Sequence, residues 1–216
     1  MDGSATIFGV GVDISGFVEI RPRAMESKRQ TLWEPSVRLD HLYETRSYDA
    51  FGCLFGVMNF ANFRPIAGER GLPSDVSDHV RRMHAEQAGM DPDSAGLWPT
   101  WVGWDEIQAI DWDEPAELAD ERLHEYVRDS AGQWVFRGKS ANAPQWLERQ
   151  GIKVPPPPWP EGGTWTTPDV QFRAVRMTRG QAVNLQGQWG PVFEVMAALG
   201  RLHGPTNCRL IVWFDR

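Results

Sequence analysis

Apolar residues alternate with polar or small residues at both ends of the chain, and this two-residue period is the strongest constraint on its fold. One side of the first run consists of Phe8, Val10, Val12, Ile14, Gly16, Val18 and Ile20. One side of the last run consists of Cys208, Leu210, Val212 and Phe214. A period of two is typical of β-strands with one face in the core. The first run predicts one long strand, or two strands that meet at a bend at Ser15 and Gly16. Because both ends carry an apolar face that needs cover, we expect them in one mainly antiparallel sheet.

Four stretches between these ends have the apolar spacing of amphipathic helices. We predict about four helices packed on the sheet, around residues 47–58, 75–88, 101–111 and 191–203. The expected first-turn and capping residues are Ser47, then Ser74 or Ser77, then Thr100, and finally Pro191. Gly89 is the expected end of the second helix. Helices on an antiparallel sheet define an α+β fold class.

The length of the chain, 216 residues, favours a single domain that covers residues 1–216. Within it, VPPPPWPEGG at residues 154–163 predicts an extended surface connection. Such a proline-rich run could also be a ligand for the aromatic groove of a partner protein. Residues 130–168 otherwise carry only weak patterns, while VQFRAVRM, which begins at Val170, indicates a short strand.

The composition excludes several classes of protein. The net charge of −7 argues against general DNA or RNA binding, because proteins that bind phosphate chains by bulk attraction are usually basic. The sequence has no apolar run long enough to cross a membrane, and its start lacks the basic-then-apolar order of a signal peptide. We therefore expect a cytoplasmic protein with no membrane contact. Cys53 and Cys208 have apolar neighbours, which predicts two buried, reduced thiols.

Tryptophan is unusually abundant, and four of the eleven indoles lie in WPTWVGWDEIQAIDW, residues 98–112. On a helix, with about 100° per residue, Trp101, Trp104 and Trp112 would fall within roughly 80° of one another. Asp105 and Asp111 would flank this arc. The arrangement suits a stacked planar ligand whose hydroxyl or amino groups need acceptors. The alternative is that the indoles belong to the core and the carboxylates are solvated.

Several arginines could supply the complementary anion site, because the guanidinium fork grips phosphate with two hydrogen bonds. Arg46 precedes a predicted helix, Arg64 and Arg70 lie in an irregular stretch, and Arg173 and Arg176 come from the late strand. Salt bridges to the 29 acidic residues are the alternative. The predicted ligand-binding residues are Trp98, Trp101, Trp104, Asp105, Asp111, Arg46, Arg64, Arg70 and Asn59.

Signals for metal or covalent chemistry are weak. Asp111, Asp113 and Glu114 could approach a hard cation, but they do not form an EF-hand pattern, and the five histidines lack metal-ligand spacing. The sequence also lacks a nucleophile elbow and a nucleophilic cysteine signature. We therefore predict no metal and no cofactor, and we assign no catalytic residue.

Several motifs together resemble a family of proteins carried by bacteriophages, prophages and actinobacterial genomes. They are RSYDAF at 46–51, GVMN at 56–59, PI at 65–66, RGLPSDVS at 70–77, WVGWDEIQAIDW at 101–112 and RLIVWFD at 209–215. Members of that family often carry a His-Ser pair before the stretch equivalent to 101–112, whereas this chain has LWPT at 97–100. The resemblance implies a phage-associated setting and no established activity.

Three functions are consistent with these patterns. The leading hypothesis is a binding protein for a nucleotide-like molecule with planar and anionic groups, which in a phage setting would sequester a defence signal. The second is a hydrolase acting on the same kind of ligand, with Asp13, Asp111 or Asp215 as acid or base. The third is a module that binds a host protein through exposed tryptophans and the polyproline segment.

Overall fold

The computed structural model describes residues 11–23, 32–90 and 98–215, and the chain divides into two compact units. The first unit draws on Met1–Arg46, Glu69–Ala109 and Trp189–Arg216, and the second on Ser47–Gly68 and Ile110–Gln188. Each unit contains one four-stranded antiparallel sheet with helices, so the α+β prediction is confirmed. The prediction of a single domain stays a prediction, and the two units are described separately.

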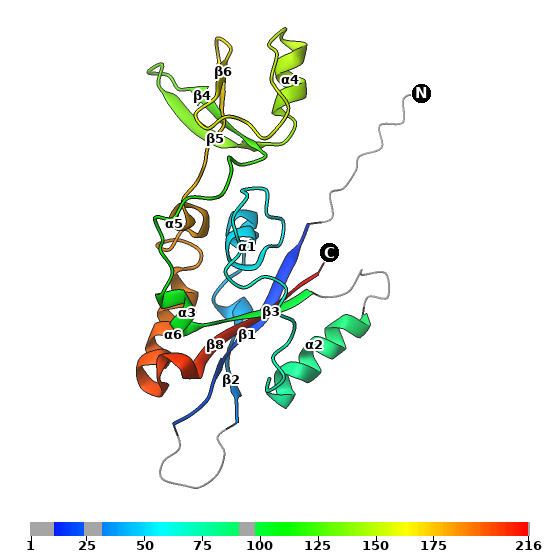
Figure 1. Cartoon of the computed structure of the whole chain (residues 1–216), viewed down its shortest axis with the longest axis vertical. Coiled ribbons are helices and arrows are strands. Elements are labelled where there is room, and N and C mark those ends of the chain that lie inside the picture. The colour runs from blue at the N-terminus through cyan, green and yellow to red at the C-terminus, as the bar shows by residue number, and fades with distance from the viewer. Residues whose placement is uncertain (1–10, 24–31, 91–97, 216) are drawn as a thin grey trace. The chain divides into compact units, whose positions relative to one another are not determined.

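The sheet of the first unit contains both terminal strands (Figure 1). Its strand order is β2-β1-β8-β3, formed by β1 (Asp13–Ile20), β2 (Glu34–Arg38), β3 (Trp98–Gly103) and β8 (Cys208–Asp215). β1 and β8 pair along their whole length, from Asp13 opposite Asp215 to Ile20 opposite Cys208. The predicted pairing of the two ends is therefore confirmed. The residues of the first run before position 11 lie outside the described part.

β1 is one continuous strand through Ser15 and Gly16, so the alternative of two strands meeting at a bend is wrong. Its neighbour β8 lies too close for a side chain at Gly16. A Cβ atom there would be 2.1 Å from the backbone oxygen of Ile211. The glycine therefore permits close pairing of the strands rather than a bend.

Helices cover both faces of this sheet. On one face, Val80 of α2 (Asp78–Met90) packs with Phe17, Ile211 and Trp213. On the other face lies α6 (Gly190–His203). The Cys208 thiol donates a hydrogen bond to the Met196 carbonyl oxygen of this helix at 3.6 Å. The expectation of a single core face is wrong for this reason. Every β8 residue from Cys208 to Phe214 is buried.

The predicted third helix is mostly a strand. Residues 98–103 form β3 and pair with β8, and only Trp104–Gln108 is helical, as α3. Thr100, the expected cap, is a buried residue in the middle of the strand, and helix α3 begins after Gly103. Pairing with a distant strand outweighs a local apolar spacing that suits a helix. The predicted helical arc of indoles is therefore wrong.

The other helices of the first unit agree better with the sequence. The hydroxyl of Ser77 accepts from the backbone N–H of Val80 at 3.3 Å, and α2 begins at Asp78. Gly89 lies inside α2 rather than beyond its end, so that prediction is wrong. Pro191 lies in the first turn of α6, as expected. The short helices η1 (Leu39–His41) and η2 (Pro205–Asn207) complete the unit.

The second unit has the strand order β5-β4-β7-β6. Its elements are α1 (Tyr48–Phe55), β4 (Leu123–Arg128), β5 (Trp134–Ser140), α4 (Ala143–Arg149), β6 (Thr164–Thr166), β7 (Val170–Arg173) and α5 (Arg179–Val183). Ser47 caps α1 as predicted, since its hydroxyl accepts from the Ala50 N–H at 3.5 Å. The strand predicted at Val170 is β7.

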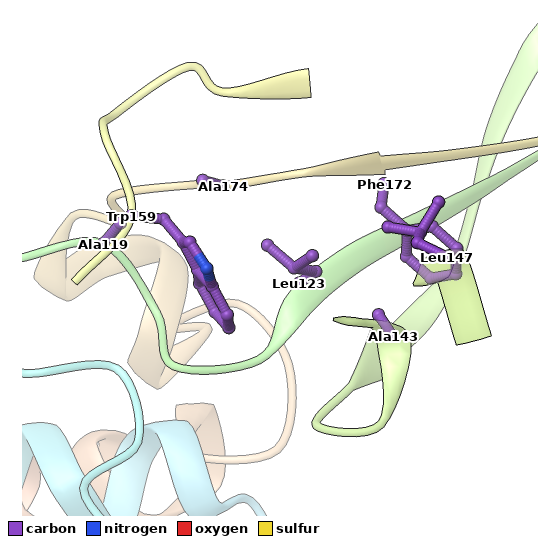
Figure 2. Close-up of a cluster of buried hydrophobic side chains, with 7 residues drawn as sticks. All are labelled: Ala119, Leu123, Ala143, Leu147, Trp159, Phe172 and Ala174. Carbon is purple, nitrogen blue, oxygen red and sulfur yellow. The ribbon is translucent and has the colours of Figure 1, made fainter. Parts of the chain in front are cut away.

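Figure 2 shows a core cluster of the second unit. It joins Leu123 of β4, Phe172 of β7 and Leu147 of α4 to Ala119, Ala143, Trp159 and Ala174. Trp159 comes from the predicted surface connection 154–163, where prolines 155–158 are exposed. Its indole N–H donates to the Pro155 carbonyl at 2.8 Å. The connection is therefore anchored to the core by its single aromatic residue.

Both cysteines are buried and unpaired with each other, which confirms the prediction of buried thiols. Burial raises the pKa of Cys53 to about 11 and that of Cys208 to about 12. Neither thiol is ionised at neutral pH, so neither is a nucleophile there. Among the described residues, no helix is long and apolar enough to cross a membrane.

Candidate functional site

The structure distributes the predicted ligand-binding residues between the two units. The first unit holds Trp98, Trp101, Trp104, Asp105, Arg46 and Arg70, and the second holds Asn59, Arg64 and Asp111. Trp98 and Trp101 lie three residues apart on β3, so their side chains are on opposite faces of the sheet. Trp104 begins α3. The three indoles therefore do not form one continuous surface.

The predicted phosphate-binding arginines contact carboxylates instead. Arg46 forms two hydrogen bonds with the Asp13 carboxylate. Both terminal nitrogens of Arg70 donate to Glu106 at 2.8 Å. Arg64 lies 3.6 Å from Glu114. The salt-bridge alternative thus describes these arginines, and binding of a phosphate would have to displace a carboxylate.

Asn59 and Asp111 make local contacts in the second unit. The Asn59 amide donates to the Phe63 carbonyl at 2.7 Å and accepts from the Phe63 N–H at 3.0 Å. The Asp111 carboxylate accepts from the Asp113 N–H at 3.0 Å. Both side chains stabilise turns of their own segments.

A hollow of about 640 Å³ in the first unit lies on the α2 face of the sheet. We call it the first hollow, and its lining includes Arg21, Trp33, Asp75, Trp101, Asp105 and Arg209. Trp101 is half-buried, and its indole lines the hollow together with the guanidinium groups.

Indoles and guanidinium groups alternate at this first hollow. The central carbon of the Arg209 guanidinium lies 3.8 Å from the Trp33 ring centroid and 5.9 Å from that of Trp101. Arg21 lies 5.3 Å over Trp33, and Arg70 lies 5.1 Å over Trp101. These are cation–π distances. The protein's own arginines thus already contact the two ring surfaces.

Carboxylates balance the cations of the first hollow. Arg209 donates to Glu19 at 2.9 and 3.0 Å and to Asp75 at 2.8 Å. Burial would raise the pKa of Asp75, but hydrogen bonds from Arg209 and Trp33 outweigh it and lower that pKa. In the same way, Arg70 and the Gly103 N–H outweigh burial and lower the pKa of Glu106. Both carboxylates are ionised at neutral pH, so this hollow has little net positive charge.

A second hollow, about 420 Å³, has a different charge. The described residues of its lining are Arg23, Trp104, Gln108, Ala197, Gly200, Arg201, Gly204 and Pro205. None of these side chains is a carboxylate. Among the described residues, neither Arg23 nor Arg201 has a carboxylate at ion-pair distance. In a chain with a net charge of −7, this is a local cationic site.

Trp104 is held at the second hollow by the shape of α6. A Cβ atom at Gly200 would lie 2.4 Å from Cδ1 of the indole, so the ring lies directly against the helix backbone. The Phe193 ring centroid is 6.5 Å from that of Trp104. The indole is half-buried, with its remaining surface beside two exposed arginines.

Sequence reasoning missed most of the residues that line these hollows. Trp33, Arg21, Arg23 and Arg201 lie far from residues 98–112 in the chain. The sequence did contain a signal for the buried ion pair of Glu19 and Arg209. These two residues place opposite charges within otherwise apolar strands. They are register partners in the antiparallel pairing of β1 and β8.

The residues named for hydrolysis or metal binding do not assemble into a common site. Asp13 and Asp215 are register partners of β1 and β8, but Asp13 contacts Arg46 and Asp215 accepts from the Gln87 amide at 2.9 Å, and Asp111 belongs to the second unit. Glu114 accepts from Arg179 at 2.9 Å. The described part of the chain contains no group of three histidine, cysteine or acidic residues arranged to hold a metal ion.

The comparisons with known proteins give no further assignment. A scan against protein-family models finds no match, and searches of curated proteins and of solved structures find none. The resemblance to a phage-associated family therefore stays a prediction.

Proposed function

We propose that the protein binds a nucleotide-like small molecule in the second hollow. Trp104 contacts the planar group, and Arg23 and Arg201 bind the anionic group. The observation that carries the proposal is a pair of arginines, neither with a carboxylate partner among the described residues, beside a half-buried indole. Planar and anionic groups are the two features that stacking and guanidinium forks recognise.

The charge of the second hollow is sufficient to favour an anion. The hollow includes the C-terminal turn of α6, where the helix dipole contributes about half a negative charge. Two guanidinium groups contribute two full positive charges and therefore outweigh it. A volume of about 420 Å³ also lies within the usual range of small-molecule sites.

Binding without a covalent step would make the protein a sequestering agent in the cytoplasm. In a phage-associated setting, the sequestered molecule would be a signalling nucleotide of the host defence. The family resemblance supports this role, and the second hollow supports the binding site.

Titration calorimetry with adenosine monophosphate tests the site. We expect saturable binding that Arg201→Ala weakens about 10- to 100-fold, since a hydrogen bond to a charged group contributes about 1.5–3 kcal/mol. Arg82→Ala is the matched control, because Arg82 is an exposed arginine on α2 outside both hollows. It should leave the affinity unchanged.

Two results would contradict the binding proposal. An equal loss of affinity in the Arg201 and Arg82 variants would show that binding depends only on non-specific charge attraction. Absence of binding heat with adenosine, guanosine, cytidine and uridine monophosphates would exclude nucleotides as the ligand class. Recovery of the nucleotide after denaturation separates the alternatives, because intact ligand indicates capture and fragments indicate the hydrolase. A co-purifying host protein without nucleotide binding would indicate the protein-binding module.

A further inference from the structure

We propose that one face of the second unit's sheet binds a short stretch of single-stranded nucleic acid. The bases stack on Phe136 and Trp134 of β5, and the phosphates contact Arg128 of β4 and Arg173 of β7. This surface belongs to the second unit, whereas the second hollow belongs to the first unit. The inference therefore goes beyond the proposed function and does not depend on it.

Helix α4 covers the other face of this sheet. Leu147 of α4 packs with Leu123 of β4 and Phe172 of β7 in the core cluster of Figure 2. Side chains alternate between the two faces along a strand, so the next residues in the chain, His124 and Arg173, lie on the face opposite α4. These two residues are register partners in the pairing of β4 and β7, which agrees with a common face.

The face opposite α4 continues with two cross-strand pairs, and we call it the aromatic face. Tyr126 is the register partner of Phe136, and Arg128 is the register partner of Trp134. Phe136 is 50% exposed, and its ring centroid lies 5.6 Å from that of Tyr126. Tyr126 and Trp134 are half-buried. Aromatic side chains on the face of a four-stranded sheet are the feature on which RNA-recognition sheets stack bases.

Guanidinium groups lie beside two of these rings. The central carbon of Arg173 is 4.0 Å from the Tyr126 ring centroid, and that of Arg128 is 4.6 Å from the Trp134 ring centroid. Among the described residues, neither arginine has a carboxylate at ion-pair distance. The strand residues that the register places on the aromatic face include no aspartate or glutamate. Rings and unpaired cations side by side suit a strand that presents both bases and phosphates.

The dimensions of the aromatic face indicate a short, unpaired ligand. At one end of the face, Lys139 is largely buried and donates to Asp49 and Asp120, so it offers no free charge there. Neighbouring strands lie about 4.8 Å apart, so β5, β4 and β7 span about 10 Å, which accommodates two or three bases. A duplex keeps its bases stacked on one another, whereas a single strand exposes them. Binding of a few stacked bases is also compatible with the net charge of −7, which disfavours only bulk attraction to phosphate chains.

Fluorescence anisotropy with a labelled single-stranded octathymidylate tests the inference. We expect saturable binding that Phe136→Ala weakens about 5- to 100-fold, because a stacking surface is lost. Phe136→Trp keeps a flat ring and should retain the affinity within about threefold. Val135→Ala is the matched control, since Val135 is the adjacent residue of β5, is 47% exposed and lies on the opposite face. It should change the affinity by less than about twofold.

The salt dependence tests the role of the arginines. Each phosphate contact in a single strand contributes about −0.7 to the slope of log affinity against log salt concentration. Arg128→Gln should therefore make this slope shallower by about 0.7, whereas Val135→Ala should leave it unchanged. A mixed-sequence DNA duplex should bind at least about 10-fold more weakly than the single strand, because its bases are not free to stack.

Several results would overturn the inference. These are no binding of the single strand, equal loss of affinity in the Phe136→Ala and Val135→Ala variants, or equal binding of single strand and duplex. Loss of oligonucleotide binding in Arg201→Ala, with Phe136→Ala unaffected, would assign the oligonucleotide to the second hollow instead. That result would overturn the inference while the proposed function stands. A protein that binds the wild type but not Phe136→Ala, without any oligonucleotide binding, would identify a protein-docking surface and would also overturn it.

Discussion

Replacing Glu19 with glutamine is expected to lower the free energy of unfolding by about 3–5 kcal/mol, as for other broken buried ion pairs. The Glu19 carboxylate is fully buried between β1 and the segment before α2. It accepts from two nitrogens of Arg209, at 2.9 and 3.0 Å, and from the Ser77 N–H at 3.1 Å. Glutamine has nearly the same shape, so the variant leaves no cavity. It leaves the buried Arg209 charge with Asp75 as its remaining acidic partner, and Asp75 is largely exposed.

Urea unfolding followed by tryptophan fluorescence measures this change, because several indoles lie near the pair. Glu34→Gln makes the same chemical substitution at an exposed position of β2 and should change the free energy of unfolding by less than about 0.5 kcal/mol. If the two variants lost the same amount of stability, the buried pair would contribute no more than a surface charge.

The terminal strands were predictable because their period of two is long and uninterrupted. Helix α6 was predictable for a similar reason, with an apolar stripe and a proline in its first turn. By contrast, the apolar spacing of residues 98–112 fits a helix locally, and β3 forms only because β8 offers backbone partners. Strand β5 has three exposed residues in its centre, so its sequence carries no clear apolar period. Long-range strand pairing determines that β3 and β5 form. The local pattern of a single sequence does not show which strands will pair.

The candidate site shows the same division between local and long-range information. Trp101, Trp104 and Asp105 were named from their spacing on a predicted helix, and they do line the hollows. The arginines named beside them, such as Arg46 and Arg70, contact carboxylates that the fold brings close. Arg21 and Arg23 come instead from the stretch after β1, and Arg201 comes from α6. A list of charged residues does not reveal which arginines keep their charge available for a ligand.

Asp120 lies in a buried ion-pair network of the second unit, from which we expect an acid sensitivity. Its side chain is fully buried and accepts from Arg122 at 2.8 and 2.9 Å and from Lys139 at 2.9 Å. Lys139 also donates to Asp49 at 2.7 Å. Burial would raise the pKa of Asp120, but His124, Arg122 and Lys139 around the carboxylate outweigh burial and hold that pKa well below its usual range. The ionised form is therefore the stable form in the fold.

Asp120→Asn is expected to lower the free energy of unfolding at pH 7 by about 3–5 kcal/mol, because Arg122 and Lys139 lose a buried counter-ion. The folded pKa lies below the unfolded value near 3.8, so the stability from Asp120 is complete above that value and is lost as the pH falls toward the folded pKa. The wild type should therefore lose stability below about pH 4.5, and the variant should lose less over the same interval. Urea unfolding at pH 7, 5, 4 and 3 measures both effects, with Asp113→Asn as the exposed control. Parallel pH profiles for wild type and Asp120→Asn would show that the acid sensitivity comes from other carboxylates, because only a group whose proton affinity changes on folding contributes to the slope.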